Sequence, residues 1–365
     1  MKVPFLDLRV TDKEELSALL DAYRGVLAHG RLVMGPEIEE FEKAIAENCA
    51  RRFSISVGSG TDALFLGLKA LDIGPGDEVI TTSLSWIATA NAIKMTGATP
   101  VFADIGDDLN INTSSVEALI SERTAGILTV NYTGRMADNV VLERLAATRG
   151  LLLVEDASQS FGATFEGRPS GSFGDLSAMS HNPMKVLAAT GEAGSIVSDD
   201  ARVVDRVRQL RYNGTVNQET CMVPSLNGRM DTVQAATLLV RLRSLATVIN
   251  ARRSHAIYYD EMLAGFVAVP PRDDSHDDAF YTYTVRSSRR EELRQHLEKL
   301  GIETKVQHPL LMPQHPAYLG SKGDWSNAAS MVNQVLCIPI HEKLTLSQRE
   351  RVADAIISFG PSMPE

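Results

Sequence analysis

Two side chains, Asp156 and Lys185, could carry out group-transfer chemistry together. Asp156 ends a short run that starts with the apolar residues 151–154, and such a run is typical of a buried strand in a parallel sheet. Ligands of open α/β sheets bind at the carboxyl ends of the strands, where this acid is expected to lie. Lys185 has apolar neighbours on both sides, and loss of solvation lowers the pKa of an amine so that it can attack a carbonyl.

This pair meets the needs of one cofactor, pyridoxal phosphate. A lysine holds the cofactor as a Schiff base, and an acid keeps its pyridine nitrogen protonated so that the ring accepts electrons. The alternative for Lys185 is an ammonium that reaches water, which is the better interpretation for an arbitrary lysine in apolar surroundings. The acid at the strand end, together with the predicted strands 176–180 and 195–198 on either side of the lysine loop, favours the cofactor.

A glycine-rich turn at residues 58–61 is a candidate anion site. It leads from a predicted strand into a helix, so that free backbone N–H groups would face an anion. The turn also satisfies the loose dinucleotide fingerprint, but the next strand ends in Thr81 and Thr82 rather than in the acid that a nicotinamide cofactor requires. We therefore expect Gly60 and Thr61 to bind a phosphate, with an ordinary tight turn as the alternative.

The first 241 residues predict a mostly parallel sheet, because short strands alternate with helices. The strands expected in this part of the chain are 53–57, 78–82, 100–104, 125–130, 151–154, 176–180 and 195–198. Trp86 comes just after one of these strand ends, where its ring could stack on a planar cofactor. The alternative for Trp86 is packing in the core, which holds for most tryptophans.

The chain divides into a predicted large α/β domain, residues 1–241, and a small C-terminal α+β domain, residues 242–365. A long helix, Arg241–Leu263, is expected to connect them, because its apolar residues follow helical spacing. The small domain is expected to begin with a strand at Phe280–Ser287. At the other end of the chain, Thr11 is the expected N-cap of the first helix.

Composition excludes several classes of protein. The chain has 365 residues and a formal net charge of −10. It therefore lacks an overall basic field that would attract nucleic acids or anionic membranes. Its three cysteines form no CxxC pair, which argues against a zinc site or a disulfide framework, and we expect no bound metal. The N-terminal residues show no signal-peptide core and no run reaches transmembrane length, so we expect a cytoplasmic protein without membrane contact.

Six motifs in a fixed order resemble one family along almost the whole chain. They are Gly58–Leu66 (GSGTDALFL), Gly74–Val79 (GPGDEV), Val154–Ala163 (VEDASQSFGA), Gly171–Asp175 (GSFGD), the Lys185 loop through Gly191-Glu192, and Leu226–Ala235 (LNGRMDTVQA). The sequence is similar to the DegT-type (DegT/StrS) sugar aminotransferases, a branch of the fold-type I pyridoxal phosphate enzymes. The resemblance implies the fold of that class, with a large domain around a mostly parallel sheet flanked by helices.

The resemblance also assigns roles to individual residues. Lys185 resembles the Schiff-base lysine that moves the proton during transamination, and Asp156 resembles the partner of the pyridinium nitrogen. The other expected cofactor contacts are Gln159 beside the phenolic oxygen, Trp86 stacked on the ring, and Gly60, Thr61 and Ser180 around the phosphate. Asn227 resembles a phosphate ligand that the family supplies from the partner subunit, which implies a homodimer with shared sites.

Three further residues are candidates for substrate contact, namely His181, Arg229 and His308. His181 stands where the family often has an aromatic residue, and a packed core histidine is the equally weighted alternative. Arg229 shares the motif of Asn227, and His308 lies in a segment of the small domain that the family uses. Several positions that face the substrate differ from the family pattern, so the sequence does not define the substrate.

The resemblance implies an aminotransferase that moves an amino group from L-glutamate to a keto sugar, which we expect to carry a nucleotide. A free keto-inositol or keto-sugar acid is the alternative acceptor. Two other classes were weighed. A dehydratase of the same fold tends to have histidine at the lysine position, and a non-catalytic regulatory protein would be expected to lose Lys185 or Asp156, whereas both are present.

Overall fold

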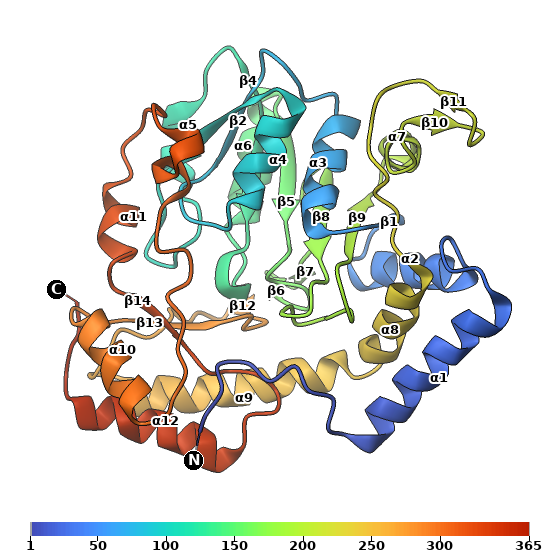
Figure 1. Cartoon of the computed structure of the whole chain (residues 1–365). Coiled ribbons are helices and arrows are strands. Elements are labelled where there is room, and N and C mark those ends of the chain that lie inside the picture. The colour runs from blue at the N-terminus through green and yellow to red at the C-terminus, as the bar shows by residue number, and fades with distance from the viewer. Residues whose placement is uncertain (1, 365) are drawn as a thin grey trace.

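Seven strands form the central sheet, in the order β1-β9-β8-β5-β4-β2-β3 (Figure 1). Their bounds are β1 (Phe53–Val57), β2 (Glu78–Thr82), β3 (Thr99–Ala103), β4 (Thr124–Val130), β5 (Leu152–Asp156), β8 (Leu176–Ser180) and β9 (Gly194–Ser198). All neighbouring strands are parallel except β9, which runs antiparallel to both β1 and β8. The computed structural model describes residues 2–364. The predicted mostly parallel α/β sheet is confirmed.

Helices cover both faces of this sheet. Successive strand residues point to opposite sides, and apolar side chains on both sides are buried under helices. On β5, Val154 packs in one core cluster and Leu153 in another. The first cluster lies under α3 (Gly60–Ala70), α4 (Ala88–Thr96) and α7 (Ala201–Leu210). The opposite face is covered by α5 (Thr113–Leu119), α6 (Asn139–Arg149), α2 (Pro36–Asn48) and α8 (Thr232–Leu242). Burial on both faces explains the continuous apolar runs of the central strands.

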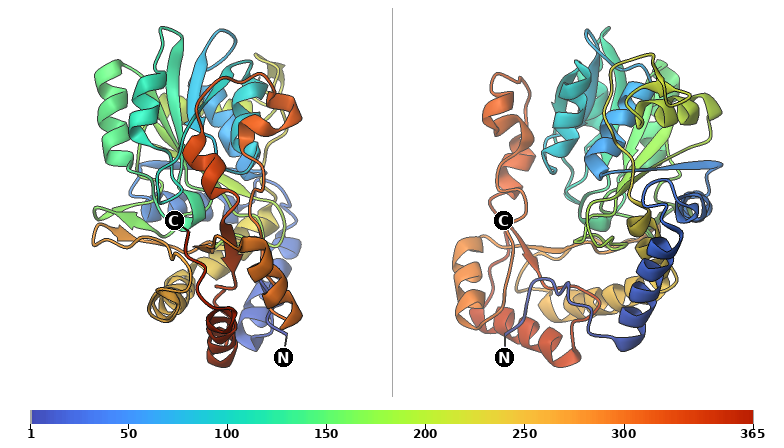
Figure 2. Two further views of the ribbon diagram at one scale, coloured as in Figure 1. Left: turned by 90° about the vertical axis from the view of Figure 1, so that its left-hand side faces the viewer. Right: turned by 45° about the vertical axis from the view of Figure 1, so that its right-hand side comes forward.

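A second core lies beside the sheet and contains the C-terminal part of the chain (Figure 2). It is built from α9 (Leu245–Leu263), α10 (Arg290–Lys299), α12 (Leu346–Phe359) and the antiparallel pair β13 (Tyr283–Arg286) and β14 (Val335–Ile338). Val3 near the N-terminus belongs to this core as well, through a bridge to Ile302. The position of the domain boundary near residue 241 stays a prediction.

The remaining elements are short or lie at the edges of the molecule. They are α1 (Lys13–His29), α11 (Ser326–Met331), the strands β6 (Thr164–Phe165), β7 (Arg168–Pro169) and β12 (His276–Asp277), the hairpin β10 (Thr215–Val216) and β11 (Thr220–Cys221), and 3-10 turns at Tyr132–Gly134, Met312–Gln314 and Pro316–Tyr318. Helix α1 packs against α8 (Figure 1).

Three local predictions need correction. The connecting helix is interrupted between α8 and α9, which meet at an angle of 61°, so it begins at Leu245 rather than at Arg241. The strand expected from Phe280 starts only at Tyr283, because Phe280 has a φ of +50°, which no strand residue adopts. The N-cap of α1 is Asp12, whose carboxylate accepts a hydrogen bond from the Glu15 N–H, and not Thr11.

No single helix of residues 2–364 is long and apolar enough to cross a bilayer. The sharply bent pair α8 and α9 meets the requirement of length and composition only when its two helices are taken together.

Candidate active site

A cleft of about 490 Å³ opens at the carboxyl ends of β2, β5 and β8. One wall comes from the sheet, and the other comes from C-terminal residues around Tyr281 and residues 305–308. The predicted site residues that line the cleft are Gly60, Thr61, Trp86, Asp156, Gln159, Ser180, Lys185 and His308. The predicted site residues that do not line it are His181, Asn227 and Arg229.

Lys185 lies in the loop that follows β8, where its backbone N–H donates to the Asn182 carbonyl at 2.8 Å. Burial lowers the pKa of the Lys185 amine to about 8, and the nearby Lys305 adds to this effect. The negative charge of Asp156 acts in the opposite direction and raises the pKa. The amine lies 4.2 Å from the centre of the Tyr281 ring. An amine with such a pKa is partly neutral near pH 7, as a nucleophile must be.

Asp156 is the last residue of β5 and is almost fully buried. Its carboxylate accepts a hydrogen bond from the Thr89 hydroxyl at 3.1 Å and another from the Ser158 N–H at 3.1 Å. Burial raises the pKa of Asp156, whereas these hydrogen bonds and the charge of Lys185 lower it. A buried acid fixed by two donors is suited to hold a cation at the floor of the cleft.

The glycine-rich turn presents the N-terminus of α3 to the cleft. The Ser59 hydroxyl caps the helix by accepting a hydrogen bond from the Asp62 N–H at 3.0 Å. Within the described residues the N–H groups of Gly60 and Thr61 have no backbone partner, so they can donate to an anion. Any side chain at Gly60 would lie 2.5 Å from the Ser180 Cβ atom, so glycine is required for this approach of α3 to the end of β8.

Trp86 and Gln159 both line the cleft and differ in exposure. Trp86 is 60% exposed, so the core-packing alternative does not hold, and its ring lies 5.8 Å from the His308 ring. Gln159 is buried, and its side-chain oxygen accepts a hydrogen bond from the Thr133 N–H at 2.9 Å. That bond fixes the orientation of the amide and leaves its NH₂ group to serve as a donor.

These residues fit pyridoxal phosphate. The N–H groups of the α3 turn, which have no backbone partner, suit a phosphate, and the fixed acid Asp156 suits a protonated pyridine nitrogen. Lys185 has an amine of lowered pKa in the same cleft, and the indole of Trp86 offers an exposed face. Among residues 2–364, no three His, Cys, Asp or Glu side chains come together in a way that could hold a metal ion.

The structure places Asn227 and Arg229 on the surface beside the glycine-rich turn of their own chain. The Gly58 N–H donates to the Gly228 carbonyl at 2.8 Å, which fixes this loop against the turn. Asn227 is exposed and accepts a hydrogen bond from the Arg229 guanidinium at 2.8 Å, and that guanidinium covers the Tyr212 ring. Neither side chain reaches the cleft of its own chain.

The two histidines have different environments. His181 is fully buried between Phe41 and Phe161 and shares a hydrogen bond of 2.9 Å with the Ser195 hydroxyl. This corrects the expectation of a substrate contact, since the ring is a core residue behind the lysine loop. His308 does line the cleft, and its Nδ1 atom shares a hydrogen bond of 3.0 Å with the Tyr132 hydroxyl. Burial lowers the pKa of His308 to about 3, so its ring is neutral at pH 7.

Sequence reasoning missed several residues of the cleft. Thr89 lies one helical turn after Trp86, and this spacing could have shown that both face the same side. Ser158 lies two residues after Asp156, a spacing typical of a short polar turn. No local pattern marks the missed residues of the C-terminal wall, Tyr281, Lys305 and Gln307.

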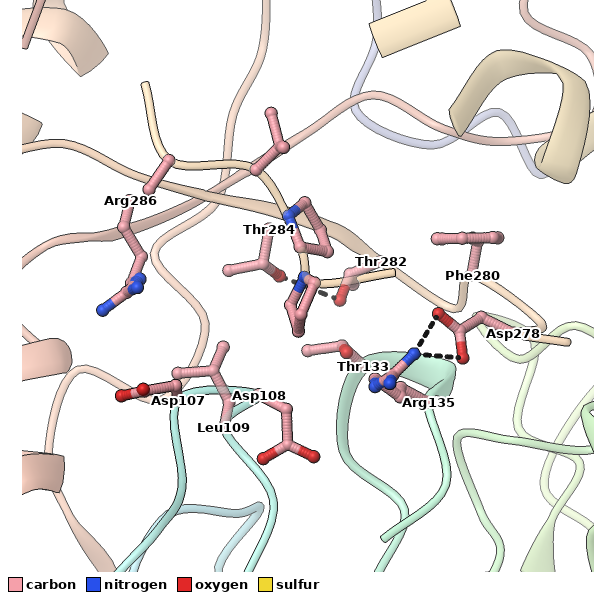
Figure 3. Close-up of a pocket in the computed structure, with 14 residues that line it drawn as sticks. Asp107, Asp108, Leu109, Thr133, Arg135, Asp278, Phe280, Thr282, Thr284 and Arg286 are labelled. Atoms are coloured by element: carbon pink, nitrogen blue, oxygen red, sulfur yellow. Dashed lines mark hydrogen bonds and ion pairs between the residues drawn. The ribbon is translucent and has the colours of Figure 1, made fainter. Parts of the chain in front are cut away.

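A second, much smaller cavity lies where the two cores meet (Figure 3). Its volume of about 30 Å³ suffices for roughly one water molecule, so it cannot hold a substrate. Figure 3 shows Arg135 pointing at the Asp278 carboxylate, and Arg135 also pairs with Asp273. Next to them, the Thr282 N–H donates to the Thr133 carbonyl and the Ala279 N–H to the Gly134 carbonyl. These contacts join the loop that orients Gln159 to the C-terminal part of the chain.

Known proteins are similar to this chain in sequence and fold over most of their length. The chain is 39% identical over 362 residues to dTDP-3-amino-3,4,6-trideoxy-alpha-D-glucose transaminase of Streptomyces venezuelae, which covers 97% of this chain and 95% of that protein. The crystal structure of S. venezuelae DesV in complex with a ketimine intermediate superposes with a TM-score of 0.95 at 38% identity and covers 98% of both chains. The structure of NtdA from Bacillus subtilis with bound cofactor PMP gives a TM-score of 0.91 at 29% identity, over 98% of this chain and 85% of that one.

The fold and the cleft thus define a pyridoxal-phosphate-dependent aminotransferase. The sequence model of the DegT/DnrJ/EryC1/StrS aminotransferase family matches residues 13–357. The chain belongs to that family. The family, the fold, the cofactor and the class of enzyme that the sequence predicted are confirmed.

Proposed function

We propose that this aminotransferase transfers an amino group from L-glutamate to a keto sugar that carries a nucleotide. The observation that carries the proposal is the cleft itself, in which Lys185 and Asp156 face a volume of about 490 Å³. The near full-length similarity to a transaminase named for a dTDP-linked amino sugar supports the choice of acceptor. A cleft of this size has room for a sugar beside the cofactor.

In this proposal each residue of the cleft has its own role. Bound pyridoxal phosphate supplies the electron sink that lets a proton leave the carbon next to the amine. The Lys185 amine holds the cofactor covalently and, when released, moves that proton. Asp156 keeps a charge-assisted hydrogen bond to the ring nitrogen, a type of bond worth roughly 1.5–3 kcal/mol. Gly60, Thr61 and Ser180 bind the phosphate.

Gln159 and Trp86 fix the ring in this proposal. The Gln159 NH₂ group donates to the phenolic oxygen, because its carbonyl is already occupied by the Thr133 N–H. Trp86 stacks on the ring with its exposed face. His308, neutral and held by Tyr132, contacts the substrate from the opposite wall.

We infer that two copies of the chain form the working unit, with Asn227 and Arg229 serving the partner's cleft. Asn227 is exposed and does not reach the cleft of its own chain, which supports a role across an interface. Helix α1 exposes an apolar stripe at helical spacing, formed by Leu16, Leu20, Tyr23 and Leu27. Such a stripe is suited to burial against a second copy. The cytoplasmic location stays a prediction.

Attachment of the cofactor tests the site directly. Reduction of the holoenzyme with borohydride, followed by peptide mass mapping, should place the pyridoxyl group on Lys185. Lys305 is the matched control, because it lies in the same cleft and would capture a loosely held aldehyde. Attachment at Lys305, or at the distant Lys69 or Lys94, would show that the site is wrongly assigned.

The acceptor is tested with the pyridoxamine form of the enzyme. L-glutamate should produce this form, seen as loss of the visible absorbance of the pyridoxal form. Nucleotide-linked keto sugars should then restore the absorbance with a higher kcat/KM than free keto-inositols or keto-sugar acids, and mass spectrometry should identify the amino sugar. Preference for a free acceptor would reject the nucleotide-linked proposal in favour of the alternative.

A further inference from the structure

Lys305 is a cation that lines the cleft and is not among the proposed cofactor contacts. It lies in the C-terminal wall, in a segment fixed to β14 by two hydrogen bonds between the backbones of Lys305 and Cys337, at 3.0 Å and 2.9 Å. Lys305, Gln307 and His308 of the same segment line the cleft. The lysine is therefore carried by a fixed backbone rather than by a free loop.

The Lys305 ammonium has no partner among the described residues. No carboxylate of residues 2–364 lies within 4.0 Å of it, and no side-chain hydrogen bond ends on it. Glu303, which precedes Lys305 by two residues, forms an ion pair with Lys2 at 2.7 Å instead. A half-buried cation without a counter-ion in a ligand cleft is placed to bind an anion of the ligand.

The other charges of the cleft show where this anion would lie. The acids that line it are Asp156, which faces the ring nitrogen in the proposed function, and Glu192, which accepts a hydrogen bond from the Asn182 side chain at 2.7 Å. His308 is neutral, and the amine of Lys185 is committed to the cofactor. Among the described residues that line the cleft of their own chain, Lys305 thus provides the positive charge that remains for a substrate, and it lies near enough to Lys185 to affect its titration.

We propose that Lys305 binds the α-carboxylate of the amino-acid donor and so directs the donor's amine to the reacting end of the cleft. An α-amino acid carries its carboxylate one carbon from the amine, which matches a cation beside the reactive lysine. The phosphates of a nucleotide sugar are separated from an aminated ring carbon by the sugar ring and fit this place less well. The inference rests on the proposed function in one respect, namely that an amino acid is the donor.

The half-reaction with the donor provides the first test. Lys305→Gln should raise the L-glutamate concentration that half-saturates conversion of the holoenzyme by about tenfold to a hundredfold, the loss expected for a charge-assisted hydrogen bond. Lys305→Arg should retain most of the affinity, because it keeps the charge. Lys322→Gln removes an exposed lysine outside the cleft and should behave as the wild type.

Two further measurements separate recognition from damage. Glutarate, a dicarboxylate without an amine, should bind the wild-type holoenzyme in calorimetry and bind Lys305→Gln more weakly. The half-reaction of the pyridoxamine form with a keto sugar that carries no carboxylate should keep its half-saturating concentration in Lys305→Gln, which also shows that the variant is folded. An effect confined to a keto acceptor that itself carries a carboxylate would overturn the proposal, because Lys305 would then bind the acceptor.

Failure of the inference and failure of the proposed function give different results. If no amino acid converts the wild-type holoenzyme, the proposed function is wrong. If L-glutamate converts both the wild type and Lys305→Gln with the same half-saturating concentration, only the role of Lys305 is overturned. An equal rise in the half-saturating concentrations of L-glutamate and of the acceptor without a carboxylate would likewise reject a specific role in carboxylate binding.

Discussion

The surroundings of Lys185 set the pKa of its amine. Burial lowers this pKa, and the negative charge of Asp156 limits how far it falls. A lysine with an ordinary pKa near 10.5 is almost wholly protonated at pH 7. A lysine with a pKa of about 8 is neutral in roughly one molecule in ten. At pH 7 most Lys185 side chains are therefore protonated, and a small neutral fraction is available to react.

The pH dependence of cofactor loading follows from this value. The folded-state pKa of Lys185 is depressed, so the reactive neutral amine is present above about pH 8 and is lost as the pH falls through that value. The rate of pyridoxal phosphate binding to the apoenzyme, followed by stopped-flow absorbance, should rise with pH and reach half of its maximum near pH 8. Asp156→Asn should move this midpoint to lower pH, since Asp156 raises the pKa. A midpoint near 10 would contradict the role of burial.

Asp156 should matter for the chemical step more than for binding. The phosphate turn at Gly60 and Thr61 is separate from the acid, so Asp156→Ala should still bind the cofactor. Loss of the charge-assisted hydrogen bond should slow the single-turnover half-reactions by on the order of 10²-fold or more. Thr89→Val is the graded control, because it removes only one of the hydrogen bonds to Asp156 and should have a smaller effect. Unchanged half-reaction rates in Asp156→Ala would refute this role.

At the scale of elements, the junction of α3 with β8 leaves no room for a side chain at Gly60. Gly60→Ala would place a Cβ atom 2.5 Å from the Ser180 Cβ atom, so the helix would have to move away from the strand end. We expect at least about tenfold weaker binding of pyridoxal phosphate, measured by equilibrium titration of the apoenzyme, because the donors of the turn would move with the helix. Gly74→Ala, whose Cβ atom would meet only ordinary contacts, should bind as the wild type. Equal affinity of the two variants would disprove the argument.

Local signals in the sequence predicted the large sheet and several of the residues that line the cleft. Apolar runs marked the strands, and Gly60, Asp156 and Lys185 follow strand ends or form turns that short motifs reveal. The opposite wall could not be predicted in this way. Lys305 and Tyr281 reach the cleft because two distant segments pack against the large core, and nothing in their own neighbourhoods marks that placement.

The errors at element ends have equally specific causes. Phe280 has the apolar character of a strand residue, but its positive φ delays the start of β13 to Tyr283. The apolar spacing of the connecting helix continues through the bend between α8 and α9, so periodicity could not locate the break. Such features are set by tertiary packing and override local preference.

At the scale of the whole molecule, shared sites predict complementation between inactive chains. Lys185→Ala and a crippling Asn227 variant should each be nearly inactive alone. In a mixed symmetric dimer, one site inherits both lesions and the other inherits neither. After random exchange about half of the dimers are mixed, so about a quarter of all sites should be intact, and steady-state assays should show activity again.

The control for this experiment is the exchange of subunits itself. Differently tagged chains should be recovered together after co-refolding, which shows that mixed dimers have formed. If they are recovered together and activity stays at the level of the parents, Asn227 acts within its own chain. The shared-site proposal would then be wrong.

The hydrogen bonds from Ala279 and Thr282 to the Gly134 and Thr133 carbonyls have a consequence for dynamics. These two amides can exchange with deuterium only when the C-terminal wall separates from the loop that holds Gln159. Their exchange rates therefore measure the free energy of opening the cleft. A ligand that bridges both walls binds the closed form alone, so it should slow exchange at these two amides by a factor equal to the ratio of total to ligand-free enzyme. Two backbone protons thereby record how tightly the enzyme encloses its substrate.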